Sequence, residues 1–175
     1  MSMASPPQFV AGMWVAMMVA MMLPGAAPAG LRAPQKLPFF AGYLGIWSVF
    51  GLAVAFVHFW LQSRGLLTDH MALASPSAAG VVLIAIGAYQ LTPWKHACLQ
   101  RCRAREVHTL AYSLACLGAS WALMGILFVV GVMSYAWIAV LALWIAAEKD
   151  LPWGNALAAA AGCGLIAWGA VNLFA

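Results

Sequence analysis

The sequence predicts an all-α polytopic membrane protein, a single domain of residues 1–175 built as a bundle of six transmembrane helices, with five as the alternative. Of its 175 residues, 66% are hydrophobic and only 7% are charged, whereas soluble domains contain about 25% charged residues. The mean hydropathy is +0.94. A soluble chain of this length could not hide so much apolar surface, so we expect a lipid bilayer as its first partner and no nucleic acid.

The six helices are predicted from six apolar runs, because a spanning helix needs about 20 mostly apolar residues. The runs are residues 8–23, 39–62, 77–91, 110–130, 134–147 and 155–174. The first follows "MSMASPP", which lacks the cationic residues of a signal peptide, so we expect this helix to be retained. The third and fifth runs are short. Only a tight turn near Gly131 separates the fourth from the fifth, so one bent or re-entrant segment would give five spans.

Prolines fall at or near the proposed helix boundaries, where a missing backbone donor does least harm. They are Pro24, Pro38, Pro76, Pro93 and Pro152.

The cationic residues divide unequally between alternate loops. One side has only Arg64, and the other has Arg32, Lys36, Lys95, Arg101, Arg103, Arg105 and Lys149. Because cationic loops are retained in the cytoplasm, the 95–108 loop is predicted to be cytoplasmic, and six spans then place both termini outside.

A candidate metal site lies in "YQLTPWKHACLQRCR", residues 89–103. Pro93 can start a helix, and Cys98 and Cys102 are four residues apart, so they share one helical face. Two thiolates on one face favour Cu(I), zinc or an iron–sulfur unit over hard cations, and together with the methionines described next they favour Cu(I). The surrounding cations would lower the thiol pKa values, and His96 is a candidate third ligand although it points elsewhere on an ideal helix. The alternative is a cytoplasmic anchor whose cations face anionic headgroups.

Thioethers follow one face of the first helix. Met13, Met17 and Met21 recur at every fourth residue, and thioethers bind Cu(I) well and most other biological cations poorly. This ladder could relay copper, or it could pack a neighbouring helix, because Met adapts to irregular interfaces. In either case we expect these side chains to face other helices rather than lipid.

Other candidate side chains have less support. His58 lies inside the second span, where it could be an outward-side ligand, a proton carrier, a haem ligand or a hydrogen-bonded structural residue. Cys116 and Cys163 are expected to be buried as small apolar groups. There is no phosphate-binding loop or nucleophile elbow, so we expect no enzymatic activity.

Several blocks of the chain resemble a known family. They are "MVAMMLP", "GYLGIWSVF", "YQLTPWKHACLQRCR", "WALMGILFVVGVM" and "EKDLP". They are similar to an uncharacterised bacterial family of predicted metal-binding integral membrane proteins, over almost the whole chain. The resemblance implies a metal role for Cys98 and Cys102 and a location in the bacterial inner membrane.

The chain departs from that family in the fourth predicted helix, which reads "YSLACLGASW". Cys116 is present, but Tyr112, Ala119 and Ser120 stand where the family has a histidine and paired cysteines. An intramembrane thiol cluster is therefore depleted here.

Two functional hypotheses follow. The first is a non-enzymatic copper-handling protein that holds or relays Cu(I) between the Met face and the cysteine pair. The alternative is an accessory or assembly subunit without metal, which binds a membrane protein or lipid through small-residue faces such as "GLIAWGAVN" and "GYLGIWSVFG". Under either hypothesis we expect a membrane-protein partner or a homo-oligomer.

Overall fold

The computed structural model describes residues 6–68, 71–103, 108–132 and 134–174, and these residues form helices. The helices are α1 (Pro7–Arg32), α2 (Lys36–Ser63), α3 (Pro76–Gln90), α4 (Pro93–Arg103), α5 (Thr109–Met124), α6 (Ile126–Val130), α7 (Tyr135–Asp150) and α8 (Gly154–Phe174). Within the described ranges, extended pairing is limited to an isolated antiparallel bridge between Leu67 and Leu73. The all-α class is therefore confirmed.

Four helices of the described chain are long and apolar enough to cross a membrane. They are α1, α2, α8 and the continuous segment Thr109–Val130 formed by α5 and α6. The pair α3 and α4, bent by 59°, adds a fifth if it is one broken span. The 16 residues of α7 extend about 24 Å, less than the roughly 30 Å hydrocarbon core. Four to five spans are supported, and the predicted sixth is not confirmed.

The first helix is longer than predicted. α1 covers Pro7–Arg32 and includes Pro24 and Pro28, so the prediction that the helix ends before Pro24 is wrong. Proline removes a backbone donor, but neighbouring helices can satisfy the backbone groups of an apolar helix. Here the hydroxyl groups of Tyr43 from α2 and Tyr112 from α5 donate to carbonyl oxygens in this part of α1, at 3.3 and 3.4 Å.

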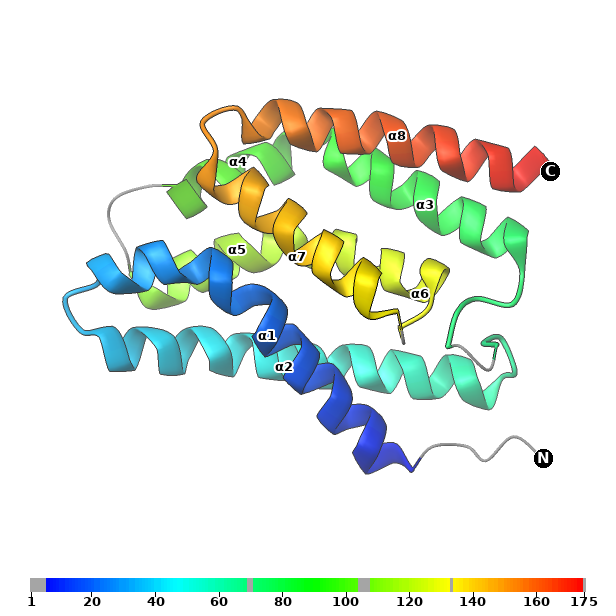
Figure 1. The fold of residues 1–175 in the computed structure, drawn as a ribbon, viewed down its shortest axis with the longest axis horizontal. Coiled ribbons are helices and arrows are strands. Elements are labelled where there is room, and N and C mark those ends of the chain that lie inside the picture. Colours follow the sequence, from blue (N-terminus) through cyan, green and yellow to red (C-terminus); the bar gives the residue numbers. More distant parts are fainter. Residues whose placement is uncertain (1–5, 69–70, 104–107, 133, 175) are drawn as a thin grey trace.

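The helices form two close pairs with three further helices between them, and α4 continues from α3 at one end (Figure 1). α1 packs along α2 at one side of the molecule and α3 along α8 at the other, while α5, α6 and α7 lie between. The approach of α3 to α8 is close, because a β-carbon on Gly87 would lie 2.7 Å from the carbonyl oxygen of Gly162. Gly131, with φ of 94°, allows the turn after α6.

One end of the bundle collects the cationic residues. The C-terminal ends of α1 and α7, the N-terminal end of α2 and the whole of α4 meet there, whereas α2 ends near Arg64 at the opposite end (Figure 1). The residues at the cationic end are Arg32, Lys36, Lys95, Arg101, Arg103 and Lys149. Arg105 lies outside the described residues. The predicted grouping of cations is thus confirmed, and the side of the membrane stays a prediction.

Candidate metal site

The methionine face of α1 points into the protein. Met17 and Met21 are buried, and Met13 is half-buried against the core. The prediction that these three side chains face other helices is therefore confirmed. Met18 and Met22 are buried more deeply, with 0% and 1% of their surface exposed. The inner surface of α1 is consequently rich in thioether sulfur along two adjoining stripes.

Cys98 and Cys102 lie on the face of α4 that packs against α5. Both side chains are buried, and the Sγ atom of Cys98 is so close to α5 that a β-carbon on Gly118 would lie 2.8 Å from it. Pro93 begins α4, as predicted. The shared face of the two cysteines is therefore confirmed, and their role as metal ligands stays a prediction.

Cys102 meets a partner that the sequence analysis assigned to core packing. Its Sγ atom lies 3.0 Å from the Sγ atom of Cys116, which is fully buried on α5. Both cysteines are free thiols. Nothing in the spacing of two cysteines on different helices indicates that they meet, because the register between α4 and α5 is set by tertiary packing. The structure thus adds a third sulfur to the same interface.

Lys149, near the C-terminal end of α7, extends its ammonium group toward the thioether face of α1. Its Nζ atom lies 3.9 Å from the Sδ atom of Met22 and 5.9 Å from the centre of the Trp47 ring. Only 5% of the Lys149 surface is exposed. A buried cation therefore lies beside the thioether face of α1.

Two tyrosines form the remaining wall of this cluster. Tyr43 donates a hydrogen bond to the carbonyl oxygen of Met22, and Tyr112 donates one to that of Gly25. The two rings lie 5.9 Å apart. They fix the sulfur-bearing part of α1 against α2 and α5, so the positions of the candidate ligands are held by packing and hydrogen bonds rather than by a loop.

A polar cleft of about 230 Å³ leads from the cationic end of the bundle to these side chains. Cys102, Tyr112 and Lys149 line it, together with Arg103 and the exposed residue Asp150. Arg32, also exposed, lies at the same cleft. The Cys102–Cys116 pair is therefore buried but adjacent to a polar opening.

The cations of α4 do not simply face lipid headgroups, as the anchor interpretation requires. Lys95 is fully buried and its Nζ atom lies 2.7 Å from the Oε2 atom of Glu148 on α7. The Nζ atom also donates to Gln90, and Trp144 donates to the other carboxylate oxygen of Glu148 at 2.8 Å. For Lys95 the anchor interpretation is wrong, because a buried ammonium group must be paired inside the protein.

Arg103 closes the same junction between α4 and α7. It donates to the carbonyl oxygen of Lys149 at 3.2 Å and to that of Glu148. Carbonyl groups in the last turn of a helix lack helical partners, and a cationic side chain can satisfy them. Arg103 thus fixes the end of α7 from which Lys149 extends.

Neither candidate histidine joins the cysteines of α4 and α5 in a metal-binding group of the described residues. His96 is half-buried on α4, and among the described residues no three His, Cys, Asp or Glu side chains form a metal-binding group. His58 is fully buried, with Trp14 and Phe128 each 6.0 Å away between ring centres. It lies fifteen residues beyond Tyr43 on α2, about 22 Å along the axis.

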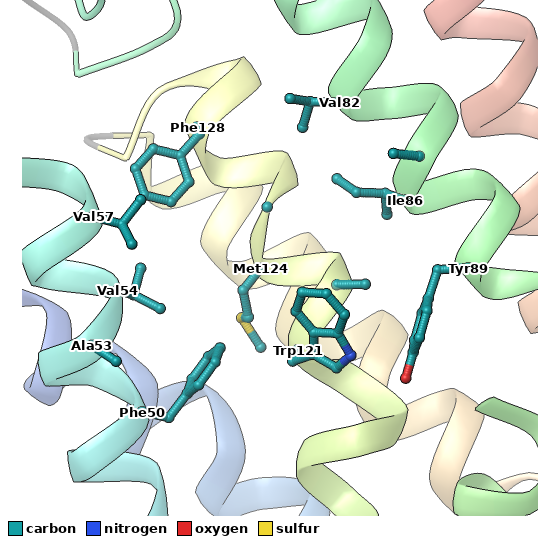
Figure 2. A pocket seen from close by; sticks show the side chains of 13 residues that line it. Phe50, Ala53, Val54, Val57, Val82, Ile86, Tyr89, Trp121, Met124 and Phe128 are labelled. Carbon is teal, nitrogen blue, oxygen red and sulfur yellow. The ribbon is translucent and has the colours of Figure 1, made fainter. Parts of the chain in front are cut away.

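A larger cleft of about 420 Å³ lies between α2, α3 and the α5–α6 segment (Figure 2). Its labelled side chains, such as Phe50, Val54, Trp121 and Met124, are apolar or aromatic and project into the gap. The hydroxyl group of Tyr89 is already used, because it donates to the carbonyl oxygen of Gly118 at 2.5 Å. Met124 carries the one sulfur atom among the lining residues, so this cleft has few side chains that could bind a metal ion.

A model of the PpoB2 family, described as copper chaperones, matches residues 11–172 of this chain. No curated protein and no solved structure matches it. The match agrees with the metal role that the resemblance implied, and its description names copper as the metal. Its description mentions neither a membrane nor bacteria, so these parts of the resemblance stay predictions.

Proposed function

The chain belongs to the PpoB2 family of copper chaperones, and on this premise we propose that it is an integral membrane protein that holds Cu(I) between Cys102 and Cys116 and passes it to a partner. The proposed role is binding and delivery, without enzymatic turnover. Cu(I) is the metal ion that thiolate and thioether ligands select among the biological cations.

The 3.0 Å contact between the two buried sulfur atoms is the observation that supports this site most. Free thiols brought together inside a protein can bind a soft ion in place of their protons. Both helices that carry them are fixed by neighbours, α4 through the Lys95–Glu148 ion pair and α5 through Tyr112. The ligands are therefore positioned before the metal arrives, which lowers the cost of ordering them.

Further sulfurs lie where copper would enter or leave this pair. Cys98 is on the same face of α4 as Cys102, and the Lys149 ammonium group lies 3.9 Å from the Sδ atom of Met22. We propose that Met21, Met17 and Met13 continue the route along α1. The competing assignment of the ligands is the one predicted from the sequence, Cys98 and Cys102 with His96.

The location follows from the charge distribution. We propose that the cationic end of the bundle faces the cytoplasm of a bacterial inner membrane, with the 95–108 loop on that side and both termini outside. In this orientation, Cu(I) reaches the Cys102–Cys116 site from the cytoplasmic side. The recipient is proposed to be another membrane protein or a second copy of this chain.

The accessory-subunit alternative loses part of its basis. Its small-residue faces are largely used within the chain, because a β-carbon on Gly169 would lie 2.7 Å from the carbonyl oxygen of Gly80, and one on Gly51 would lie 3.2 Å from the Cα atom of Val15. Gly164 and Gly45, by contrast, adjoin open space, since no heavy atom of the described residues would come within 4 Å of a β-carbon added at either glycine. Those open positions are the part of each face that could still meet a partner.

The test is copper binding by the purified full chain under anaerobic, reducing conditions. We expect one tightly bound Cu(I) per chain, measured by metal analysis and by competition with a chromogenic chelator. The double variant Cys102→Ser/Cys116→Ser should lose this copper, because a hydroxyl group is a poor soft ligand. Cys163→Ser is the matched control, since Cys163 is exposed on α8.

Single variants separate the two ligand assignments. If Cys102 and Cys116 hold the metal, Cys116→Ser abolishes tight binding and Cys98→Ser weakens it less. The reverse order would favour the pair on α4. Full copper content in the Cys102→Ser/Cys116→Ser variant would refute the proposed site.

A further inference from the structure

The polar cleft at Cys102 carries more positive than negative charge. Lys149, Arg103 and Arg32 line it, and Asp150 is its one carboxylate among the described lining residues. A free Cu(I) ion is itself a cation and would be repelled by this lining. A Cu(I) complex with two small thiolates is an anion and would be attracted to it.

We propose that the cleft admits copper as an anionic Cu(I)–thiolate complex of a small thiol, and that Lys149 is the counter-ion of the copper–thiolate group before and after transfer. This inference rests on the proposed function, because it takes the Cys102–Cys116 pair as the receiving site. It adds the chemical form in which the copper arrives and the residue that selects that form.

Lys149 is suited to this role by its position. The described residues form one salt bridge, between Lys95 and Glu148, so none of their carboxylates lies within 4.0 Å of the Lys149 ammonium group. It lies instead 3.9 Å from Met22 Sδ and lines the same cleft as Cys102, whose sulfur contacts that of Cys116. Burying a cation without a counter-ion is costly. An anionic copper–dithiolate group at the adjacent sulfurs would supply the missing negative charge.

The other cations of the cleft have different roles. Arg103 is held by carbonyl oxygens at the end of α7, and Arg32 is exposed at the cleft. Both raise the local potential for an approaching anion, but of these three cations Lys149 alone is buried. Lys149 is therefore the residue that we expect to remain in contact with the loaded site, as a positioning residue and not as a ligand.

The transfer step balances without any oxidant or reductant. Two copper–sulfur bonds to the carrier thiolates break, and two form to the sulfurs of Cys102 and Cys116. The two cysteine protons pass to the departing thiolates, which leave as neutral thiols. Copper remains Cu(I) throughout, and the charge next to Lys149 is the same before and after the exchange.

The test compares Cu(I) supplied by small thiols of similar size and different charge. The probes are Cu(I) complexes of 3-mercaptopropionate, which adds negative charge, and of cysteamine, which makes the complex cationic. With the full chain in neutral detergent we expect loading from the mercaptopropionate complex to be at least about tenfold faster, and this preference to shrink as salt screens the charges. Equal loading from both complexes would overturn the inference.

Variants then locate the preference. Lys149→Gln should reduce loading from the anionic complex by about tenfold and largely remove the preference between the probes, and Lys149→Arg should restore much of it. Lys36→Gln is the matched control, because Lys36 is exposed at the same end of the bundle and does not line the cleft. An unchanged preference in Lys149→Gln would refute the counter-ion role.

The two proposals fail in different ways. If the wild-type chain loads from both probes at the same rate, Cu(I) binding stands and the anionic-carrier inference falls. If the wild-type chain takes copper from neither probe, the proposed copper site falls and this inference falls with it. The comparison of probes on the wild-type chain needs no variant, so a variant that fails to fold does not prevent a decision.

Discussion

Replacing Glu148 with alanine should strongly destabilise the protein. Glu148 pairs with Lys95 at 2.7 Å, and the exposed fractions of the two side chains are 3% and 0%. The substitution leaves the Lys95 ammonium group buried without its counter-ion and removes the acceptor of the Trp144 indole N–H. Breaking a buried ion pair in this way costs about 3–5 kcal/mol.

That loss can be measured as a shift of the melting temperature. For a chain of this size, 1 kcal/mol corresponds to roughly 2–4 °C, so the variant should melt about 6–20 °C below the wild type. The assay is thermal unfolding of the detergent-solubilised protein, followed by circular dichroism. Asp150→Ala is the matched control, because Asp150 is on the same helix end and exposed, and it should shift the melting temperature by little.

A double substitution tests the reasoning itself. If the cost arises from an uncompensated buried charge, Lys95→Met/Glu148→Met should recover most of the stability, because replacing both members of a buried pair by apolar groups is often neutral or stabilising. A Glu148→Ala variant as stable as Asp150→Ala would refute the reasoning. So would a double variant less stable than Glu148→Ala alone.

Three further predictions concern the cysteine interface and the topology. Gly118→Ala should destabilise the α4–α5 contact by about 1–3 kcal/mol through overpacking, measured by thermal unfolding, whereas Gly164→Ala, at an open position, should not. A mild thiol oxidant should link Cys102 to Cys116, whose sulfurs lie 3.0 Å apart, and peptide mass spectrometry should find that pair cross-linked; a different pairing would contradict the geometry. A reporter fused after Arg103 should behave as cytoplasmic and one fused to the C-terminus as external, and a periplasmic signal from the first would reverse the orientation.

The apolar composition and the prolines predicted the class of the fold and several helix boundaries. The apolar runs predicted helices, and Pro76 and Pro93 do begin α3 and α4. The same reasoning failed at Pro24, where the helix continues. A proline ends a helix when its surroundings cannot satisfy the freed backbone groups, and those surroundings are supplied by other helices. The sequence near Pro24 does not reveal them.

The candidate site was predicted only in part, for a related reason. Periodicity within α4 placed Cys98 and Cys102 on one face of that helix, and periodicity within α1 placed its methionines on one face of α1. Both placements are confirmed. Which helices meet is a tertiary property, so the contact of Cys102 with Cys116 could not be derived. The inward direction of the Lys149 side chain could not be derived either, because a charged side chain at the end of a predicted span is expected to face the headgroups.

The pairing of α3 with α8 has a consequence for the order of events during synthesis. About 60 residues separate the end of α3 from the start of α8, and at roughly 5–20 residues per second the ribosome needs about 3–12 s to make them. For that time α3 exists without the helix whose glycines fit against its own (Figure 1). The nascent chain therefore passes through a stage in which the short helix α3 lacks its closely packed neighbour, and the pair forms only after α8 has been made.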